Sequence, residues 1–333
     1  MKPILDRIRR RLRPRAASPL ILMYHRVAAP PVDPWDLAVA PDRFAAQLEV
    51  LRATRRTLPL SAFVEHARRG TLPADAVAMT FDDGYADTLR HATPRLAAVG
   101  LPATLFLATA FVGQRVEYWW DELARAILER DAALDVQVVI GDAVQSLRLD
   151  AVTGAAGESA AWRAADPPRS TRASLYYTLW DRLRSLAASE RDAAMARLRE
   201  ALRLSPSRPD DLPLTADDVG TLASGGLVDI GGHTATHPVL TRLDPAERRH
   251  EIAEGKRACE QLTGRPAVGF AYPFGANDAD ARAAVAECGF AWACTTVARP
   301  VAPVETDWFG LPRIAVTNLD AGAFERALWM ASA

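Results

Sequence analysis

The sequence predicts an α/β protein built on a parallel sheet, open or closed into a barrel, that one long insertion interrupts. Three observations support this fold class. Short apolar segments alternate with helical patterns through most of the chain, as in strand–helix–strand units. The alternation stops after Gly113 and resumes near Thr215. The length of 333 residues suits a single α/β barrel that carries an insertion.

Four strands are expected before the interruption. Each is an apolar run bounded by loop residues, and helical patterns separate them. The expected strands are residues 20–25, 57–60, 76–81 and 103–108. Among the helices between them, one begins at Pro41, and another runs from Tyr85 to Val99, where Gly100 suits a C-terminal cap.

The interruption predicts a mainly helical insertion, which we interpret as a candidate lid over the active-site end of the sheet. Its expected elements are a helix from Trp119, a hairpin around Gly141 and helices at 172–187 and 190–202. Four further strands are expected after it, at residues 227–230, 268–272, 290–295 and 311–316. The expected organisation is a basic extension at 1–18, one sheet domain in two parts at 19–112 and 215–333, and the insertion at 113–214.

Composition excludes few functions but sets useful limits. The hydrophobic share of 49% is ample for a core. A net charge of -1 gives no reason to expect nucleic acid as a partner. The three cysteines, Cys259, Cys288 and Cys294, lie outside the chemical motifs and are expected to be small buried residues in a reducing compartment.

The N-terminal residues are basic, and four apolar side chains could line one face of a helix there, namely Ile4, Leu5, Ile8 and Leu12. We favour a solvated extension; the alternative is a weak contact with an anionic membrane surface. No export signal or sufficiently long apolar run is visible. The expected location is the cytoplasm, or a peripheral position at the inner membrane face.

The segment MTFDDG places two carboxylates, Asp82 and Asp83, directly after a buried strand. In α/β sheets and barrels, that end of a strand is where catalytic groups normally lie. Successive strand residues point in opposite directions, so the two carboxylates are expected to have different roles. Taken alone, Asp-Asp-Gly is also ordinary turn chemistry.

The segment HTATH places His233 and His237 four residues apart after another expected strand. Taken alone, such a pair is more often structural or surface-exposed. Together with the carboxylates of FDDG at a neighbouring strand end, the histidines favour a divalent metal site with an open position. Such an ion lowers the pKa of a bound water, and a nearby carboxylate can then accept its proton. Together these groups can catalyse hydrolysis.

Hydrolysis of an amide needs two further groups. A backbone N–H at Phe274 or Gly275 is a candidate oxyanion stabiliser. A leaving amine needs an acid, and His25 at the end of the first expected strand faces the same mouth. A satisfied histidine at the edge of the core is the alternative for His25.

Four motifs in this order resemble those of the polysaccharide deacetylase family (NodB homology, carbohydrate esterase 4). They are YHRV at 24–27, TFDDG at 80–84, HTATH at 233–237 and FAYPFG at 270–275. The resemblance implies a distorted (β/α) barrel of about seven parallel strands and metal-dependent removal of acetyl groups from sugars. By motif position, Asp82 resembles the general base, and Asp83, His233 and His237 resemble the metal ligands. Tyr272 lies in the motif that implies oxyanion and substrate contacts.

The sequence also departs from the family pattern. Many members carry an arginine where this chain has Ala271, and we hypothesise that Arg313 reaches the base carboxylate instead. The C-terminal Leu-x-His acid of many members is absent, which strengthens the case for His25. Trp308 is similar to a family tryptophan that lines the acetyl pocket, although a structural role is equally compatible. All but one of five aromatic residues of the insertion are expected to form its own core. The five are Trp119, Trp120, Tyr176, Tyr177 and Trp180.

The predicted function is a metal-dependent hydrolase that removes N-acetyl groups from an N-acetylated glycan, a lipid-linked sugar or another sugar. Zn²⁺ is the expected ion, with Co²⁺, Ni²⁺ or Mn²⁺ as alternatives. One rival is a metal hydrolase of the same fold that cuts a non-sugar amide or imide. The other is a catalytically silent glycan-binding homologue.

Overall fold

A computed structural model of the chain describes residues 17–151, 161–302 and 307–332. Its main sheet follows the order β10-β1-β3-β4-β7-β8-β9, with all neighbours parallel, and β2 pairs with β3 beside this path. The strands are β1 (Leu20–Tyr24), β2 (Arg56–Thr57), β3 (Ala76–Phe81), β4 (Ala103–Leu107), β7 (Val228–Gly232), β8 (Gly269–Ala271), β9 (Trp292–Cys294) and β10 (Ile314–Ala315).

The sheet curls toward a barrel because the segment around β10 contacts both of its edges. Ile314 and Ala315 pair with β1, while Leu311 forms a parallel bridge with Cys294 of β9. The predicted distorted barrel of about seven parallel strands is therefore confirmed. The expected strand at 57–60 is wrong beyond Thr57, because Pro59 caps α3 and ends the extended segment.

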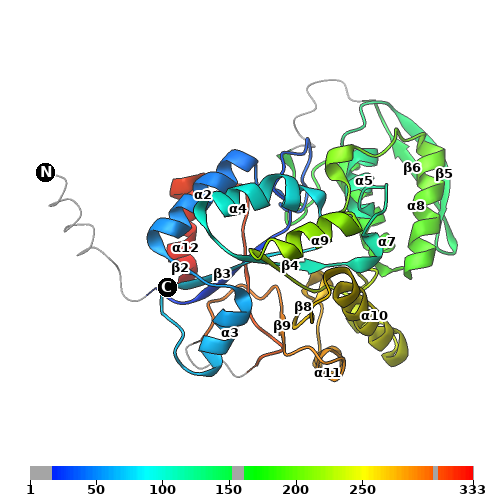
Figure 1. The fold of residues 1–333 in the computed structure, drawn as a ribbon. Coiled ribbons are helices and arrows are strands. Elements are labelled where there is room, and N and C mark those ends of the chain that lie inside the picture. Colours follow the sequence, from blue (N-terminus) through cyan, green and yellow to red (C-terminus); the bar gives the residue numbers. More distant parts are fainter. Residues whose placement is uncertain (1–16, 152–160, 303–306, 333) are drawn as a thin grey trace, which may run out of the picture.

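Helices cover the outside of the sheet (Figure 1). They are α2 (Pro41–Thr54), α3 (Leu60–Arg68), α4 (Thr93–Val99), α9 (Ala216–Ser224), α10 (Pro245–Thr263), α11 (Ala279–Glu287) and α12 (Ala321–Ser332). Short helical turns are η1 (Thr88–Ala92), η2 (Thr109–Phe111), η3 (Pro209–Asp211), η4 (Leu240–Arg242) and η5 (Pro273–Gly275). The sequence did not predict α12, which lies beside α2 and buries Phe324 and Leu328.

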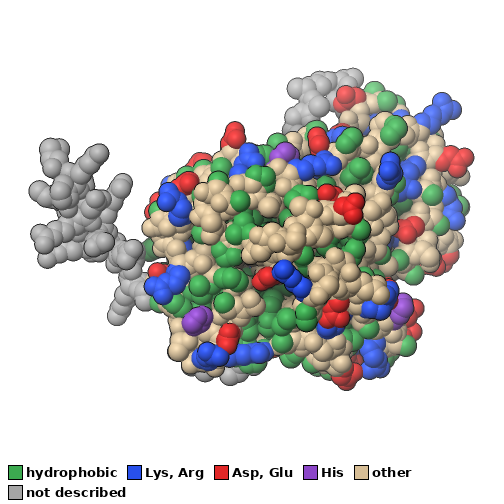
Figure 2. Space-filling view, viewed as in Figure 1, with side chains coloured by type: hydrophobic (Ala, Val, Ile, Leu, Met, Phe, Trp, Pro, Cys, Tyr) green, Lys and Arg blue, Asp and Glu red, His purple; other side chains and the backbone are tan. Residues whose placement is uncertain are grey.

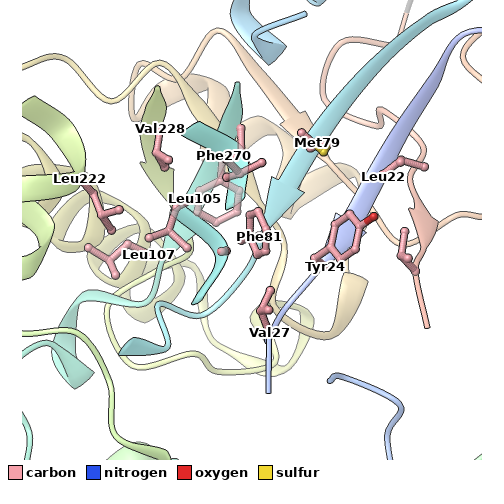
Figure 3. Close-up of a cluster of buried hydrophobic side chains, with 14 of the residues drawn as sticks. Leu22, Tyr24, Val27, Met79, Phe81, Leu105, Leu107, Leu222, Val228 and Phe270 are labelled. Carbon is pink, nitrogen blue, oxygen red and sulfur yellow. The ribbon is translucent and has the colours of Figure 1, made fainter. Parts of the chain in front are cut away.

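Side chains alternate between two apolar layers along the strands. Val77, Met79 and Phe81 of β3 belong to one apolar cluster with residues of neighbouring strands and of the covering helices, and Figure 3 shows the last two within this cluster. Ala76 and Ala78 belong instead to a second cluster with Phe106 of β4 and residues of α3. Because alternate residues face opposite sides of a strand, the position after Phe81 faces the same side as Ala78 and Thr80.

The insertion forms one packed unit at one end of the molecule (Figure 1). Its elements are α5 (Trp119–Ile127), β5 (Leu134–Ile140), β6 (Ala143–Leu149), α7 (Thr171–Ser185) and α8 (Ala188–Leu202). The hairpin predicted around Gly141 is confirmed, because β5 and β6 pair antiparallel around that residue, which has a φ of 63°. The exact domain boundaries at 113 and 214 stay a prediction.

The surface carries interspersed charges of both signs on the face shown in Figure 2. Within the described ranges, none of the helices has the length and apolar character needed to cross a bilayer. The basic extension at 1–18 lies almost entirely outside the described residues, so its expected membrane contact stays a prediction.

Candidate active site

Asp82 is the first residue after β3, and it faces the interior of the curled sheet. Its carboxylate is 2% exposed and accepts two hydrogen bonds of 2.7 Å from the Nη1 and Nη2 atoms of Arg313. Arg313 also donates to Thr80 and to the carbonyl of Thr295, which fixes the orientation of its guanidinium. Burial alone would raise the pKa of Asp82, but Arg313 and His233 outweigh it and lower the pKa. The side chain is therefore a carboxylate at neutral pH.

Asp83 points elsewhere because the chain turns sharply after Asp82. Asp83 has a φ of 74° and Gly84 a φ of 107°, and a Cβ on Gly84 would lie 2.4 Å from Leu107. The turn thus requires glycine at position 84. Two donors hold the Asp83 carbonyl, the Ala108 N–H and the Tyr118 hydroxyl, both at 3.1 Å.

The loop that carries both histidines (residues 233–237, the histidine loop) follows β7, and several hydrogen bonds hold it. His233 shares a 2.7 Å hydrogen bond between Nδ1 and the carbonyl of Ala271, so its Nε2 faces Asp83. The loop itself is strained, with a φ of 66° at Thr234 and 56° at His237. Glu251 of α10 accepts from the N–H groups of residues 235 and 236 and holds the loop between the histidines.

Asp83, His233 and His237 form a buried cluster whose geometry suits a metal ion. Their ligand atoms lie within 4.8 Å of one another. The Nε2 atoms of the two histidines lie 3.5 and 3.4 Å from the same Asp83 oxygen. Atoms that bind one tetrahedral ion at 2.0–2.2 Å lie roughly 3.3–3.6 Å apart, and a ligating histidine usually donates the N–H of its other ring nitrogen to an acceptor such as a carbonyl. Both features fit a divalent ion.

The protonation states of His237 and Asp83 also suit this role, whereas Asp83 and Asp82 raise the pKa of His233 against the effect of burial. Burial lowers the pKa of His237 to about 3, which leaves a neutral imidazole able to ligate. Burial would raise the pKa of Asp83, but the contacts with the histidines outweigh it and lower the pKa to about 2. The Nδ1 of His237 is buried with no hydrogen-bond partner in the described part of the chain. The ring is held by packing against Trp120 and Phe274, with ring centres 5.1 and 4.5 Å away.

A pocket of about 340 Å³ opens above the two carboxylates and the two histidines. Five predicted residues besides Asp82 and Asp83 line it, namely His25, His233, His237, Tyr272 and Phe274. His25 follows β1 and is half-buried, and its charge would contribute to the low pKa values of both carboxylates. A buried base, a cluster suited to a metal and an accessible pocket together can support hydrolysis of an amide or ester.

A family model described as polysaccharide deacetylase matches residues 69–135 and 199–293. These ranges include both the FDDG and the HTATH segments, now seen side by side. The chain belongs to the polysaccharide deacetylase family. Membership makes the protein a hydrolase of the carbohydrate deacetylase class. The unmatched residues between the two ranges, 136–198, all lie within the predicted insertion.

Solved structures of deacetylases share the fold of this family member. The Streptococcus pyogenes deacetylase PplD, in complex with acetate, has a TM-score of 0.59 at 16% identity, over 96% of this chain and 100% of that one. IcaB from Ammonifex degensii has a TM-score of 0.59 at 18% identity, over 95% and 98% of the two chains. A de-N-acetylase from Aggregatibacter actinomycetemcomitans has a TM-score of 0.54 at 13% identity, over 93% and 99%. No curated protein matches the chain in sequence.

Two predicted substrate-contacting residues need correction. The N–H of Gly275 donates to the carbonyl of Tyr272 at 2.9 Å, so it is not free to stabilise an oxyanion, and Phe274 is the remaining candidate. Trp308 lies outside the pocket, where its ring stacks 5.0 Å from the guanidinium of Arg68 and packs against the cluster of α3. A structural role therefore explains Trp308.

Several residues that line the pocket carry no recognisable signal in the sequence. They are Trp35 and Leu37 from the loop after β1, Thr296 after β9 and Arg184 from the insertion. Trp120 and Trp180 also line it, so two insertion aromatics, not one, reach the pocket. The helical spacing of these aromatics was the available signal, but it indicated only that they share a buried face.

Proposed function

We propose that the protein is a divalent-metal-dependent hydrolase that removes N-acetyl groups from an N-acetylated sugar or glycan. One observation carries the proposal. Asp82, clamped by Arg313, lies beside a buried Asp83–His233–His237 cluster at the base of a single pocket. Family membership supports acetyl as the group that is removed, with the sugar amine as the leaving group.

Asp83, His233 and His237 would hold the ion, which when bound would polarise the amide carbonyl and make water a better nucleophile. Asp82 accepts a proton from the attacking water, and the bidentate contact with Arg313 keeps the carboxylate ionised and oriented. The N–H of Phe274 is the candidate donor that stabilises negative charge on the former carbonyl oxygen. His25, across the pocket, is the candidate acid that returns a proton to the leaving amine.

Several finer points belong to the same proposal. We take Zn²⁺ as the ion because two imidazoles and one carboxylate suit it, although Co²⁺, Ni²⁺ and Mn²⁺ accept the same ligands. A polymeric glycan, a lipid-linked sugar or another small sugar remains a candidate substrate class. The proposed location is the cytoplasm or the inner membrane face, with the basic N-terminal residues as a weak membrane contact.

The absence of the family arginine at position 271 and of the C-terminal histidine motivated the alternative of a silent glycan-binding homologue. The contact between Arg313 and Asp82 weakens that alternative, because the carboxylate has an arginine partner from another strand. A pure binding protein would also have no need to clamp a buried carboxylate beside a metal site.

Acetate release from N-acetylglucosamine oligomers, with chelator-treated and Zn²⁺-reloaded protein, tests the proposal. We expect acetate only from reloaded protein. The variant Asp82→Asn should bind the ion normally yet lose about 10²–10⁴-fold in kcat, because the base is gone. His237→Ala should lose the ion, while the exposed control His250→Ala keeps both ion and activity. Full activity in Asp82→Asn or His237→Ala, or no ion bound by the wild type, would overturn the assignment.

A further inference from the structure

Helix α7 of the insertion forms one side of the active-site pocket. Trp180 and Arg184 lie one turn apart on this helix, and both line the pocket. The helix falls within residues 136–198, which the family model leaves unmatched. This side of the pocket is therefore built by elements outside the part of the chain that the family model matches, which makes it a place where substrate selection can vary within the family.

Two aromatic rings hold the side chain of Arg184 in place. Its guanidinium carbon lies 4.6 Å from the centre of the Trp180 ring and 5.9 Å from that of Phe274. Trp180 is in turn packed against Trp35, with ring centres 4.1 Å apart. A guanidinium stacked in this way loses little further freedom when it binds a ligand.

The planar guanidinium retains unused donors. Among the described residues, its one hydrogen bond runs from Nη2 to Asp181 at 2.6 Å, although a guanidinium offers five N–H donors. Asp181 does not line the pocket, and its side chain is 54% exposed. An exposed pair of this kind contributes little to stability, so a ligand can compete for the arginine.

Charge at the pocket is unevenly distributed. Asp82 and Asp83 lie at the base, where Arg313 pairs with the first and the two histidines surround the second. At the rim, the described lining residues are His25, Trp35, Leu37, Arg184, Phe274 and Thr296. Arg184 contributes the fixed positive charge there, and none of these rim residues is acidic. The rim therefore favours a negatively charged group.

We propose that Arg184 binds an anionic substituent, a carboxylate or a phosphate, on the acetylated sugar. The inference rests on the proposed function and deepens it by naming the substrate class. A planar guanidinium can donate two parallel hydrogen bonds to either anion, and such charge-assisted bonds are the strong ones. Arg184 is thus a specificity-determining residue, separate from the proposed general base Asp82 and from the metal cluster.

The test compares binding of neutral and anionic sugars by calorimetry with chelator-treated protein, in which hydrolysis is absent. The probes are N-acetylglucosamine, its 1-phosphate and 6-phosphate, and N-acetylmuramic acid. We expect at least one anionic sugar to bind about tenfold to a hundredfold more tightly than the neutral one, with the preference reduced by salt. The phosphate and carboxylate probes distinguish the two sources of charge.

Matched variants assign the effect to its residue. Arg184→Gln should abolish the preference, whereas Arg182→Gln removes the same charge from the same helix outside the pocket and should leave it intact. Equal binding of neutral and anionic sugars by the wild type, or an unchanged preference in Arg184→Gln, would overturn the inference. Acetate release by reloaded protein is read separately. A charge preference without acetate would overturn the proposed function alone, and acetate without a preference would overturn this inference alone.

Discussion

At the level of single residues, the pairing of Asp82 with Arg313 decides how the base behaves. Both side chains are almost fully buried, and neither charge would be tolerated there alone. The arginine reaches the carboxylate from the segment that closes the barrel, although 231 positions separate the two residues. The pair therefore couples closure of the sheet to the protonation state of the proposed catalytic carboxylate.

Replacing Arg313 should change both stability and the pH profile. In Arg313→Met, the unpaired carboxylate should reduce the free energy of unfolding by about 3–5 kcal/mol. Arg313 holds the pKa of Asp82 down, so its loss should move the acid limb of kcat/KM to higher pH, because the ionised form then requires a higher pH.

Urea unfolding and pH profiles of acetate release check these two effects. Arg313→Lys keeps the charge but not the bidentate geometry, and it provides a second variant if the methionine variant folds poorly. Arg265→Met, at an exposed arginine, serves as the control. An acid limb that stays in place in both Arg313 variants would contradict the pairing's proposed role.

Some of the site residues could be predicted from the sequence and others could not. Asp82, Asp83, His233 and His237 follow strands in short motifs, and parallel strands bring such ends together. Arg184 and Trp35 carry no such signal, because their position depends on how the insertion docks on the sheet. The orientation of Trp308 likewise depended on a contact with Arg68 that no local pattern encodes.

At the level of elements, helix α8 of the insertion contacts the histidine loop directly. Arg191 is 2% exposed and donates from Nη2 to the carbonyl of Thr236 at 2.9 Å. Thr236 immediately precedes His237, whose backbone lies in the strained left-handed region. The insertion thus helps to hold a proposed ligand in place.

Removing this support should weaken metal binding. We expect Arg191→Met to bind Zn²⁺ about tenfold less tightly, since groups that orient ligands typically contribute 10–100-fold in affinity. Competition with a chromophoric chelator measures the dissociation constant. Arg197→Met replaces an exposed arginine on the same helix and should leave the affinity unchanged. An unaltered dissociation constant in a well-folded Arg191→Met would show that α8 does not position the loop.

Helices and strands were predicted correctly where a local sequence pattern determines them. The predictions failed where the end of a segment or its packing partner determines the structure. The hairpin of β5 and β6 alternates in sequence around a Gly-Asp turn, and the structure confirms it. The extended segment at 57–60 is mostly not a strand, because Pro59 is the N-cap of α3, which begins at Leu60. Helix α12 was missed, and its apolar face is recognisable only once α2 is present to pack against it.

Across the whole molecule, a buried charge network joins the sheet domain to the insertion. Arg26 after β1 lies 2.9 Å from Asp87, 2.6 Å from Asp211 and 3.8 Å from Asp121 of α5. Asp121 also accepts a 2.6 Å hydrogen bond from Tyr85, near the FDDG turn. Arg26 therefore faces three carboxylates, of which Asp211 also pairs with Arg208 at 2.6 Å, and Asp121 lies furthest from Arg26.

This arrangement predicts a specific pH dependence of stability. Burial raises the pKa of Asp121 from 3.8 to about 7, despite the opposing effect of Arg26. Between these values the folded protein retains a proton that the unfolded chain releases. The contribution of Asp121 is therefore fully present below about pH 4 and is lost as the pH rises toward 7, a change of about 4 kcal/mol at 1.36 kcal/mol per pKa unit.

The variant Asp121→Asn isolates this effect, because an amide resembles the neutral acid and can still accept the Tyr85 hydrogen bond. The free energy of unfolding of the variant minus that of wild type should increase by about 2–3 kcal/mol as the pH rises from 5 to 8. Urea titrations with chelator present measure the difference without a metal contribution. Asp142→Asn, at a fully exposed position on the hairpin, should show no such gain. A constant difference between Asp121→Asn and wild type across this range would mean that Asp121 is ionised in the folded protein, with Arg26 and Arg208 together able to compensate the three carboxylates.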